Sequence, residues 1–164
     1  MQILYQMDIT DDYSLENLDI FLENFGNIKV EDNGEEKIID NQEEMELFQS
    51  DEIEYIKENI PVLIENLEKI DTLIDNHLEG WTINRLSKVD KEILRVAVYE
   101  FLFRKDIPME VSINEAVEMA KNFGGNNSSK FVNGILGSIY RTLQLEKWRE
   151  HSDSILRTML SVLV

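Results

Sequence analysis

Cysteine is absent from the 164-residue sequence, and proline and glycine are scarce, with two and seven residues. Without cysteine the chain has no disulfide framework, no thiol nucleophile and no thiolate ligand for zinc. So little proline and glycine, together with 43% hydrophobic residues, is typical of a helical globular protein rather than a disordered or all-β one. The length suits one domain with a single core.

Long apolar runs are also missing. No stretch approaches the roughly 18–20 apolar residues of a membrane span, and residues 1–8 carry no positive charge of the kind that precedes a signal sequence. The sequence therefore predicts a cytoplasmic protein that is neither secreted nor inserted in a membrane.

Residues typical of catalytic and metal sites are few or scattered. His77 and His151 have no second histidine at ligand spacing, so both are interpreted as surface or helix-end residues. Adjacent acids such as Glu35-Glu36 are expected by chance in so acidic a region and indicate solvated faces. No glycine cluster is followed by the Lys-Ser/Thr pair of a phosphate-binding loop. None of these residues is nominated as a catalytic or metal site.

Basic residues are outnumbered, and the formal net charge is −17. This balance by itself argues against a nucleic-acid partner, because phosphate binding depends on Lys and Arg. The charge is uneven, however. Residues 1–80 hold 4 basic and 23 acidic residues, whereas residues 81–144 hold 9 and 7. One acidic half thus precedes one nearly neutral half.

Apolar residues recur at helical spacing along most of the chain. In the first half they predict helices over residues 2–7, 13–25 and 45–78, where Pro61 either begins a new helix or kinks a long one. Residues 27–40 are polar and acidic without periodicity, and predict a mobile surface loop.

Two helix starts are predicted in the second half. Ser87 and Ser112 are each followed three positions later by a carboxylate, Asp90 and Glu115, the pattern that caps free amides in a first helical turn. The first of these helices should stop near Pro108, because the residue before a proline disfavours the helical conformation.

The turn between the last two predicted helices, residues 123–131, contains two glycines, four small polar residues and a new helix start near Ser128. Several backbone amides of such a turn could bind an anion. Phe123 and Phe131 flank it, and an aromatic ring beside an amide-rich turn could stack on a base of single-stranded RNA. From the residues alone, the alternative that both rings belong to the core is favoured.

A basic stripe is predicted on the helix that follows Ser87. Its members step by three or four residues: Arg85, Lys88, Lys91 and Arg95. The default interpretation is a solvated face, since the stripe alone is a weak nucleic-acid footprint.

Four segments of the second half closely resemble the C-terminal half of the NusB family. They are RLSKVDKEILRVAVYEFL at 85–102, DIP at 106–108, VSINEAVEMAKNFG at 111–124 and KFVNGIL at 130–136. The match is ordered, nearly free of gaps and highly specific. A fainter one covers QILYQ at 2–6, which is similar to the end of the family's first helix.

The resemblance implies an all-α fold, a compact helical bundle of the NusB type with two helical subdomains. A single NusB-like domain is expected over residues 1–142, with an acidic subdomain at 1–80 and a signature subdomain at 81–142. Residues 143–164 are expected to form a C-terminal helical extension. Neither catalysis nor a cofactor is implied.

The resemblance further implies a transcription antitermination factor. NusB pairs with NusE, a small-subunit ribosomal protein, and together they bind boxA-type RNA and help the transcription elongation complex to read through terminators, notably in ribosomal RNA operons. Matched by position, the RNA and NusE surface would include Tyr5, Asp90, Arg95, Phe123, Gly124, Asn127, Lys130 and Phe131. The resemblance thus favours a binding role for both phenylalanines.

One departure from the family concerns the N-terminus. Family members usually carry an arginine-rich segment ahead of the stretch matched by residues 2–6, whereas Met1 directly precedes Gln2 here. Either the reading frame starts upstream or the basic segment has been lost. Loss of its phosphate contacts is expected to weaken RNA binding and flatten its salt dependence.

Two other functions stay open at this point. The chain could be the NusB-like domain of a ribosomal RNA cytosine methyltransferase, although residues 143–164 contain no glycine with which a methyl-donor-binding loop could begin. It could also be an interaction protein that keeps the fold without binding RNA. Homodimers occur in the family, and the sequence does not decide whether this chain forms one.

Overall fold

The computed structural model describes residues 1–24, 27–32, 35–40 and 50–162. The chain divides into two compact units, Met1–Glu68 and Lys69–Val164. Helices dominate both units, which confirms the all-helical fold class predicted from the sequence. The predicted subdomain division at residue 80 rests on a change of charge and stays a prediction.

The first unit contains helices α1 (Gln2–Thr10), α2 (Leu15–Asn24) and α4 (Ser50–Glu65). Helix α1 ends because Asp11 adopts the left-handed conformation, with φ 54°, and its amide donates to the Met7 carbonyl. The buried face of α1 carries Ile3, Leu4 and Met7, at the helical spacing predicted from the sequence. Pro61 lies inside α4, so the alternative in which it begins a new helix is wrong.

Residues 27–32 and 35–40 form two strands, so the prediction of a mobile surface loop over residues 27–40 is wrong for these two segments. Strand β1 (Asn27–Asp32) pairs antiparallel with β2 (Glu35–Asp40), with Asn27 opposite Asp40 and Asp32 opposite Glu35. The sequence between the strands is Asn33-Gly34, the dipeptide that most strongly favours a two-residue hairpin connection. The missing helical periodicity thus reflects a hairpin.

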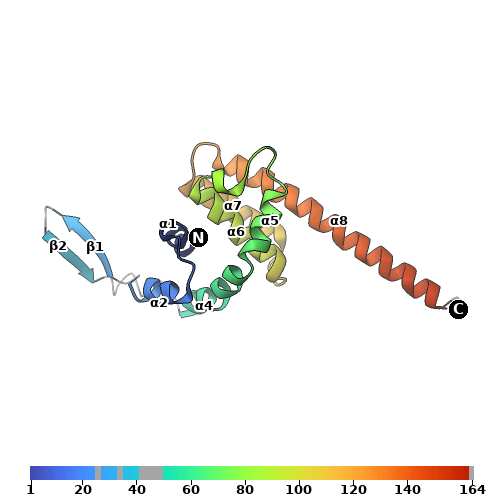
Figure 1. Ribbon diagram of the computed structural model, residues 1–164, viewed down its shortest axis with the longest axis horizontal. Helices are drawn as coiled ribbons and strands as arrows, with labels where there is room; N and C mark the ends of the chain where they lie inside the picture. The colour runs from blue at the N-terminus through green and yellow to red at the C-terminus, as the bar shows by residue number, and fades with distance from the viewer. Residues whose placement is uncertain (25–26, 33–34, 41–49, 163–164) are drawn as a thin grey trace. The chain divides into compact units, whose positions relative to one another are not determined.

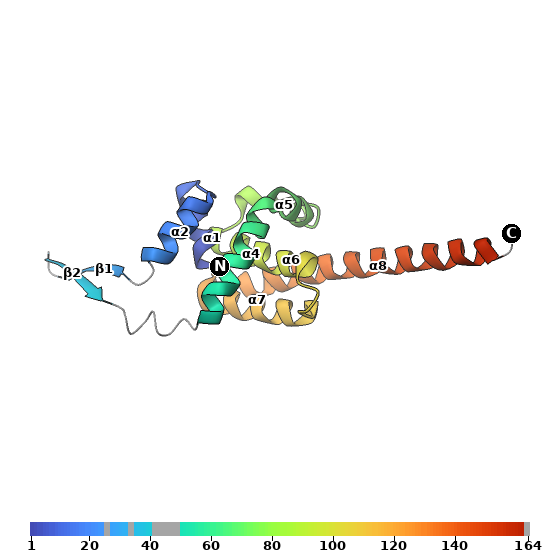
Figure 2. The same ribbon diagram turned by 90° about the horizontal axis from the view of Figure 1, so that it is seen from below.

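The second unit is built around α6 (Lys88–Phe103), α7 (Met109–Phe123) and α8 (Ser128–Val162), which pack side by side (Figures 1 and 2). Helix α5 (Leu67–Asp75) and the short 3-10 helix η1 (Ile83–Arg85) precede them. The core is made mainly by apolar side chains of α6, α7 and α8 that are buried: Ile93, Leu94, Ala97, Val98, Phe101, Ala116, Ala120, Val132, Leu136 and Ile139.

The two helix starts predicted from the serines have different outcomes. Ser87 caps α6 as predicted, because its Oγ accepts a 3.1 Å hydrogen bond from the Asp90 amide. Helix α7, in contrast, begins at Met109, and the Val111 and Ser112 amides donate to the Pro108 carbonyl. The cap predicted at Ser112 is therefore wrong, and Ser112 is a buried residue of the first turn.

The middle of the long helix α8 is joined to the end of α5 through His77. Its ring Nδ1 lies 2.8 Å from the Leu73 carbonyl oxygen, and Nε2 lies 2.9 Å from the Thr142 hydroxyl. In the neutral ring, Nδ1 donates to the carbonyl and Nε2 accepts from Thr142. His77 is thus a helix-end histidine with a structural contact, as the sequence predicted for its position.

The cap at Ser87 gives a direct test of how α6 begins. Replacing Ser87 with Ala leaves the Asp90 amide without its acceptor, so the free energy of unfolding should fall by about 1 kcal/mol. Urea unfolding followed by circular dichroism measures this loss. Ser154→Ala removes an exposed hydroxyl within α8 and serves as the control; an equal loss in both variants would contradict the assignment.

Candidate nucleic-acid interface at the α7–α8 turn

The reversal of the chain between α7 and α8 is closed by hydrogen bonds at both of its ends. The Gly124 amide donates to the Ala120 carbonyl at 3.0 Å and ends α7. The Gly125 amide donates to Ser128 Oγ at 2.8 Å, while the Ser128 amide donates to the Gly125 carbonyl at 3.0 Å. Ser128 is buried, and the turn from α7 into α8 is correspondingly tight.

Gly124 is required by space rather than by an unusual backbone conformation. Its φ is −92°, which any residue adopts. A Cβ at this position would lie 2.4 Å from Ser128 Cβ and 2.6 Å from the Ala120 carbonyl oxygen, far inside contact distance. A side chain at residue 124 would therefore push the ends of α7 and α8 apart.

Phe123 is the most conspicuous side chain of the turn, because 56% of its surface is exposed. The prediction that it belongs to the core is wrong: Phe123 is the last residue of α7, and most of its ring is exposed there. Phe131, one turn into α8, is partly buried. The two rings that flank the turn thus differ, with one presented to solvent and the other half-covered.

Polar and basic side chains also lie exposed at the end of the turn. Asn127 and Lys130 are both exposed, at the start of α8. The amides of Gly124, Gly125, Ser128 and Phe131 are already bonded within the chain. The anion-binding capacity predicted from backbone amides is reduced accordingly, and Lys130 is the cation of the turn.

Asp90 and Arg95 lie inside the second unit rather than on its surface. The Arg95 side chain is 6% exposed and its guanidinium is held on two sides. Nε and Nη2 donate to the two carboxylate oxygens of Asp71 in α5 at 2.8 and 2.7 Å, and Nη1 donates to Glu92 Oε1 at 2.8 Å. Asp90 is buried beside its helix cap. Arg95 therefore ties α5 to α6.

The predicted solvated basic stripe is not present as such. Arg85 and Lys88 are exposed, but Lys91 and Arg95 are buried. The helical spacing was right, and the neighbouring elements cover half of the stripe.

Among the predicted residues, Tyr5 belongs to the other unit, where it is partly buried on α1.

Trp81 is an exposed aromatic residue that the sequence did not single out. It follows Gly80, whose φ is +73°, and 57% of its surface is exposed. The Arg85 guanidinium lies 5.3 Å from the centroid of its ring, a cation–π contact. A tryptophan after a glycine, ahead of a helix cap, was the available signal for a loop aromatic.

The opposite end of α7 is tied to α8 by a hydrogen bond between two exposed groups. The Tyr140 hydroxyl donates to Glu110 Oε1 at 2.7 Å. This bond lowers the pKa of Glu110 below its ordinary value and raises the pKa of Tyr140. In the part of the chain that the structure describes, no three acidic or histidine side chains gather as metal ligands, and no helix is long and apolar enough to cross a membrane.

The chain belongs to the NusB family, whose model matches residues 1–141. Among its relatives, the transcription antitermination protein NusB of Clostridium perfringens is 38% identical over 144 residues, which cover 88% of this chain and 93% of the relative. The protein of the same name from Acetivibrio thermocellus is 45% identical over 141 residues, covering 86% and 83%. These relatives are antitermination proteins, which favours that function over the two alternatives.

Two solved structures also resemble this chain over most of its length. NusB of T. maritima is 40% identical with a TM-score of 0.66, covering 85% of this chain and 84% of that one. A crystal structure of the antitermination factors NusB and NusE in complex with double-stranded RNA gives 26% identity and a TM-score of 0.63, covering 85% and 89%. The helical bundle predicted from the resemblance is thereby confirmed.

The Arg95 ion pairs predict a large stability effect. Arg95→Met removes the cation and leaves the buried Glu92 and the largely buried Asp71 facing each other, so the free energy of unfolding should fall by about 3–5 kcal/mol. Chemical unfolding measures the loss. The matched control is Arg104→Met, which breaks the more exposed Arg104–Asp106 pair and should cost much less. Similar losses would show that the Arg95 pairs carry no special structural role.

Proposed function

We propose that this protein is a non-enzymatic transcription antitermination factor that binds boxA-type single-stranded RNA together with NusE, the small-subunit ribosomal protein. The RNA contact is assigned to the α7–α8 turn, with Phe123, Gly124, Asn127, Lys130 and Phe131 as its residues. Tyr5, Asp90 and Arg95 have other roles in the proposal, because none of them lies in this turn. Asp90 and Arg95 are buried: Arg95 joins α5 to α6, Asp90 lies in the first turn of α6, and Tyr5 is assigned to the partner surface of the first unit.

The exposure of Phe123 is the observation that carries the proposal. An aromatic ring with more than half of its surface in water has lost most of the free energy that burial would supply. Single-stranded RNA presents unstacked bases, and a base that stacks on such a ring contributes about 1–3 kcal/mol. The tight turn at Gly124 fixes the backbone that carries the ring, so little backbone entropy is lost on binding.

Lys130 and Asn127 supply the polar part of the same surface. A lysine beside a stacking ring pairs with a phosphate of the RNA backbone, while an asparagine amide can donate to and accept from a base edge. The chain carries a net charge of −17, so electrostatic repulsion between the whole protein and the RNA backbone opposes binding. A second protein that adds positive charge therefore fits the proposal, and NusE has this role in it.

The Phe123 assignment is tested by substitution. Phe123→Ala should weaken binding of boxA-type RNA to the chain and NusE mixed together by about 10- to 100-fold, the loss of one stacked base. Fluorescence anisotropy with a labelled RNA measures the dissociation constant. Val111→Ala truncates another exposed apolar side chain of α7, about 18 Å along the helix, and should leave binding unchanged. Equal effects, or none at Phe123, would contradict the stacking role.

The Lys130 assignment is tested by salt dependence. A lysine that neutralises one phosphate contributes roughly one unit to the slope of the logarithm of affinity against the logarithm of salt concentration. Lys130→Ala should flatten the slope by about that amount, and Lys147→Ala, an exposed lysine of α8 more than four turns away, should not. An unchanged slope for Lys130→Ala would remove this residue from the interface.

A further inference from the structure

Trp81 and Arg85 form an exposed pair in the loop that leads from α5 into α6. The Arg85 guanidinium lies 5.3 Å from the centroid of the Trp81 ring, and 57% of Trp81 is nevertheless exposed. The ring therefore retains surface on which a second flat group can stack. The loop beneath the pair is anchored, because the amide of the buried Ile83 donates to Asp75 Oδ1 at 2.7 Å.

The pair lies at the same end of the α6–α7–α8 bundle as the α7–α8 turn. Helices α6 and α7 pack side by side and are joined by the short segment 104–108, so they run antiparallel (Figures 1 and 2). The first residue of α6, Lys88, is therefore at the end where α7 stops and α8 begins. Arg85 precedes Lys88 by three residues, which places the pair within about 10 Å of the start of α6.

The exposed charges at this end of the bundle are all basic. Two segments make up this end, which is named the turn end: residues 80–91, with the loop and the first turn of α6, and residues 120–134, with the end of α7 and the start of α8. Their exposed charged side chains are Arg85, Lys88, Lys121 and Lys130. The one acid in these segments, Asp90, is buried. The turn end is thus locally basic although the chain carries −17.

The acids nearest to the turn end along the chain leave this charge in place. Glu79 is exposed, but it precedes Gly80, where a φ of +73° turns the chain. The Asp75 carboxylate accepts a hydrogen bond from a loop amide, and Glu118 pairs with Lys121. Lys121 is thus partly neutralised, whereas the guanidinium of Arg85 lies against an aromatic ring rather than a carboxylate. A polyanion is the ligand that such a surface attracts.

We propose that Trp81 and Arg85 form a second stacking site for single-stranded RNA, at the same end of the bundle as the α7–α8 turn. One base stacks on the Trp81 ring, and the Arg85 guanidinium donates to a neighbouring phosphate. A guanidinium that is already stacked keeps its N–H groups in the plane of its fork, where they match a phosphate. This inference rests on the RNA-binding function proposed above and adds a site to it.

RNA suits the pair better than a protein surface does. Tryptophan and arginine are also frequent at protein–protein interfaces, but there they lie within an apolar patch. Between residues 69 and 110, all of which the structure describes, Trp81 is the only large apolar side chain that is exposed. Its exposed neighbours in the loop are small or polar: Gly80, Thr82, Asn84 and Ser87. A single aromatic ring on a polar, basic surface is typical of a base-stacking platform.

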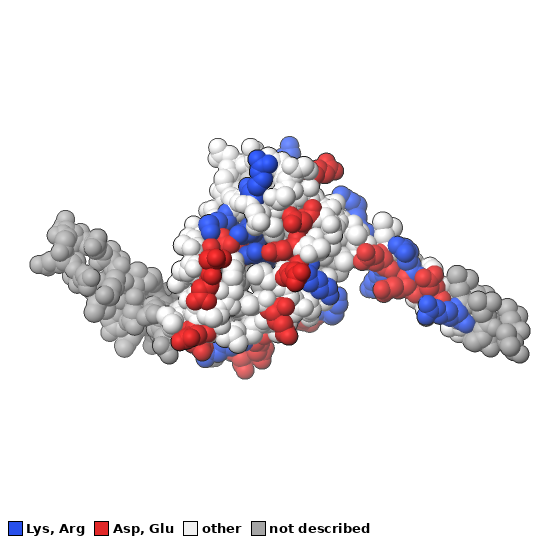
Figure 3. All heavy atoms as spheres, viewed as in Figure 1, with Lys and Arg blue, Asp and Glu red and all other residues white. Residues whose placement is uncertain are grey.

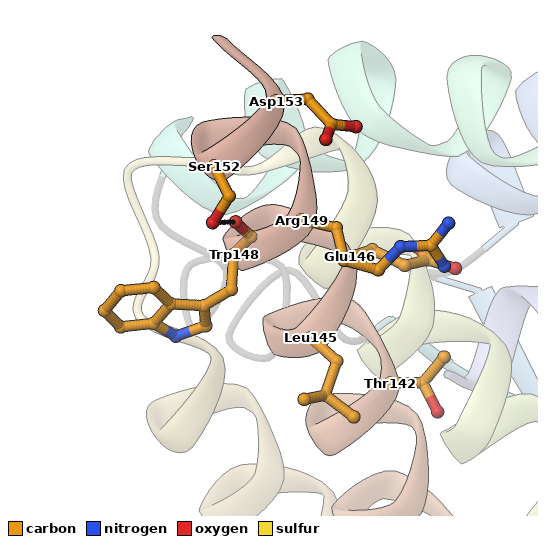
Figure 4. Close-up of a pocket in the computed structure, with 7 residues that line it drawn as sticks. All are labelled: Thr142, Leu145, Glu146, Trp148, Arg149, Ser152 and Asp153. Atoms are coloured by element: carbon orange, nitrogen blue, oxygen red, sulfur yellow. Dashed lines mark hydrogen bonds between the residues drawn. The ribbon is translucent and has the colours of Figure 1, made fainter. Parts of the chain in front are cut away.

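The other tryptophan of the chain, Trp148, provides a matched control. It is 65% exposed on α8, beyond the residues that the family model matches. Figure 4 shows its ring projecting away from the helix, and Figure 3 shows acidic and basic side chains intermixed along this part of α8. Trp148 is therefore an exposed tryptophan without a uniformly basic surrounding.

Affinity measurements test the contribution of Trp81. The probe is a labelled boxA-type RNA extended at both ends by uridines, added to the chain and NusE mixed together. Trp81→Ala should weaken binding by about 10- to 100-fold, the loss of one stacked base. Trp81→Phe keeps a stacking ring and should stay close to wild type, and Trp148→Ala should bind as wild type does. The proposal is overturned if Trp81→Ala binds normally, or if Trp81→Phe is as weak as Trp81→Ala.

Fluorescence identifies the occupant of the ring. In Trp148→Phe the tryptophan emission of the chain comes from Trp81 alone. The emission of a chain with both tryptophans replaced by Phe, in the same mixture with NusE, is subtracted as the blank. A base stacked on the ring should quench the remaining emission when the RNA is added. A change that is complete with NusE alone, before any RNA is present, would overturn the proposal and assign the pair to the protein partner.

Phe123→Ala, measured with the same RNA, separates the failure of this site from the failure of the proposed function. If the wild-type complex binds the RNA and Phe123→Ala weakens binding while Trp81→Ala does not, the second stacking site is wrong and the proposed function stands. A wild-type complex that does not bind the RNA would overturn both. Loss of affinity in each variant separately is the expected result.

Discussion

The close approach of Gly124 to Ser128 and to the Ala120 carbonyl is the constraint on which the candidate interface depends. It ends α7 at Phe123, begins α8 four residues after Gly124 and leaves no room for a side chain between the two helices. Phe123 is the last residue of that helix and most of its ring is exposed, and Asn127 and Lys130, in the turn and at the start of α8, are exposed as well. One glycine thus converts a core position of the helical pattern into an exposed one.

The buried ion pairs of Arg95 fix the scaffold behind this turn. They join α5 to α6, and α6 in turn packs on α7 and α8. A guanidinium enclosed by two carboxylates contributes geometric specificity more than net stability, because desolvation offsets most of the attraction. The same network explains how a residue matched to the family's binding surface can lie inside this protein. Arg95 holds α5 and α6 together and is itself buried.

The parts of the fold that follow from local chemistry were predictable, and those that depend on distant contacts were not. The cap at Ser87 depends only on neighbouring residues, and the sequence predicted it correctly. Ser112 is also followed three positions later by a carboxylate, but Pro108, with its fixed φ, begins the helix earlier. Spacing placed Lys91 and Arg95 on one face but could not reveal Asp71, 24 residues away, which covers it. Residues 27–40 lack helical periodicity, and the dipeptide Asn33-Gly34 is the part of their sequence that favours a hairpin connection. The candidate site came from the resemblance, because spacing alone assigned Phe123 to the core.

The central claim is that the α7–α8 turn is the RNA-binding surface. It is tested most directly by following the backbone amide resonances of the labelled chain, with unlabelled NusE present, while boxA-type RNA is added. Shift changes and line broadening concentrated in residues 123–131 are the predicted result. Changes confined to other parts of the chain, with residues 123–131 unaffected at saturation, would contradict the account.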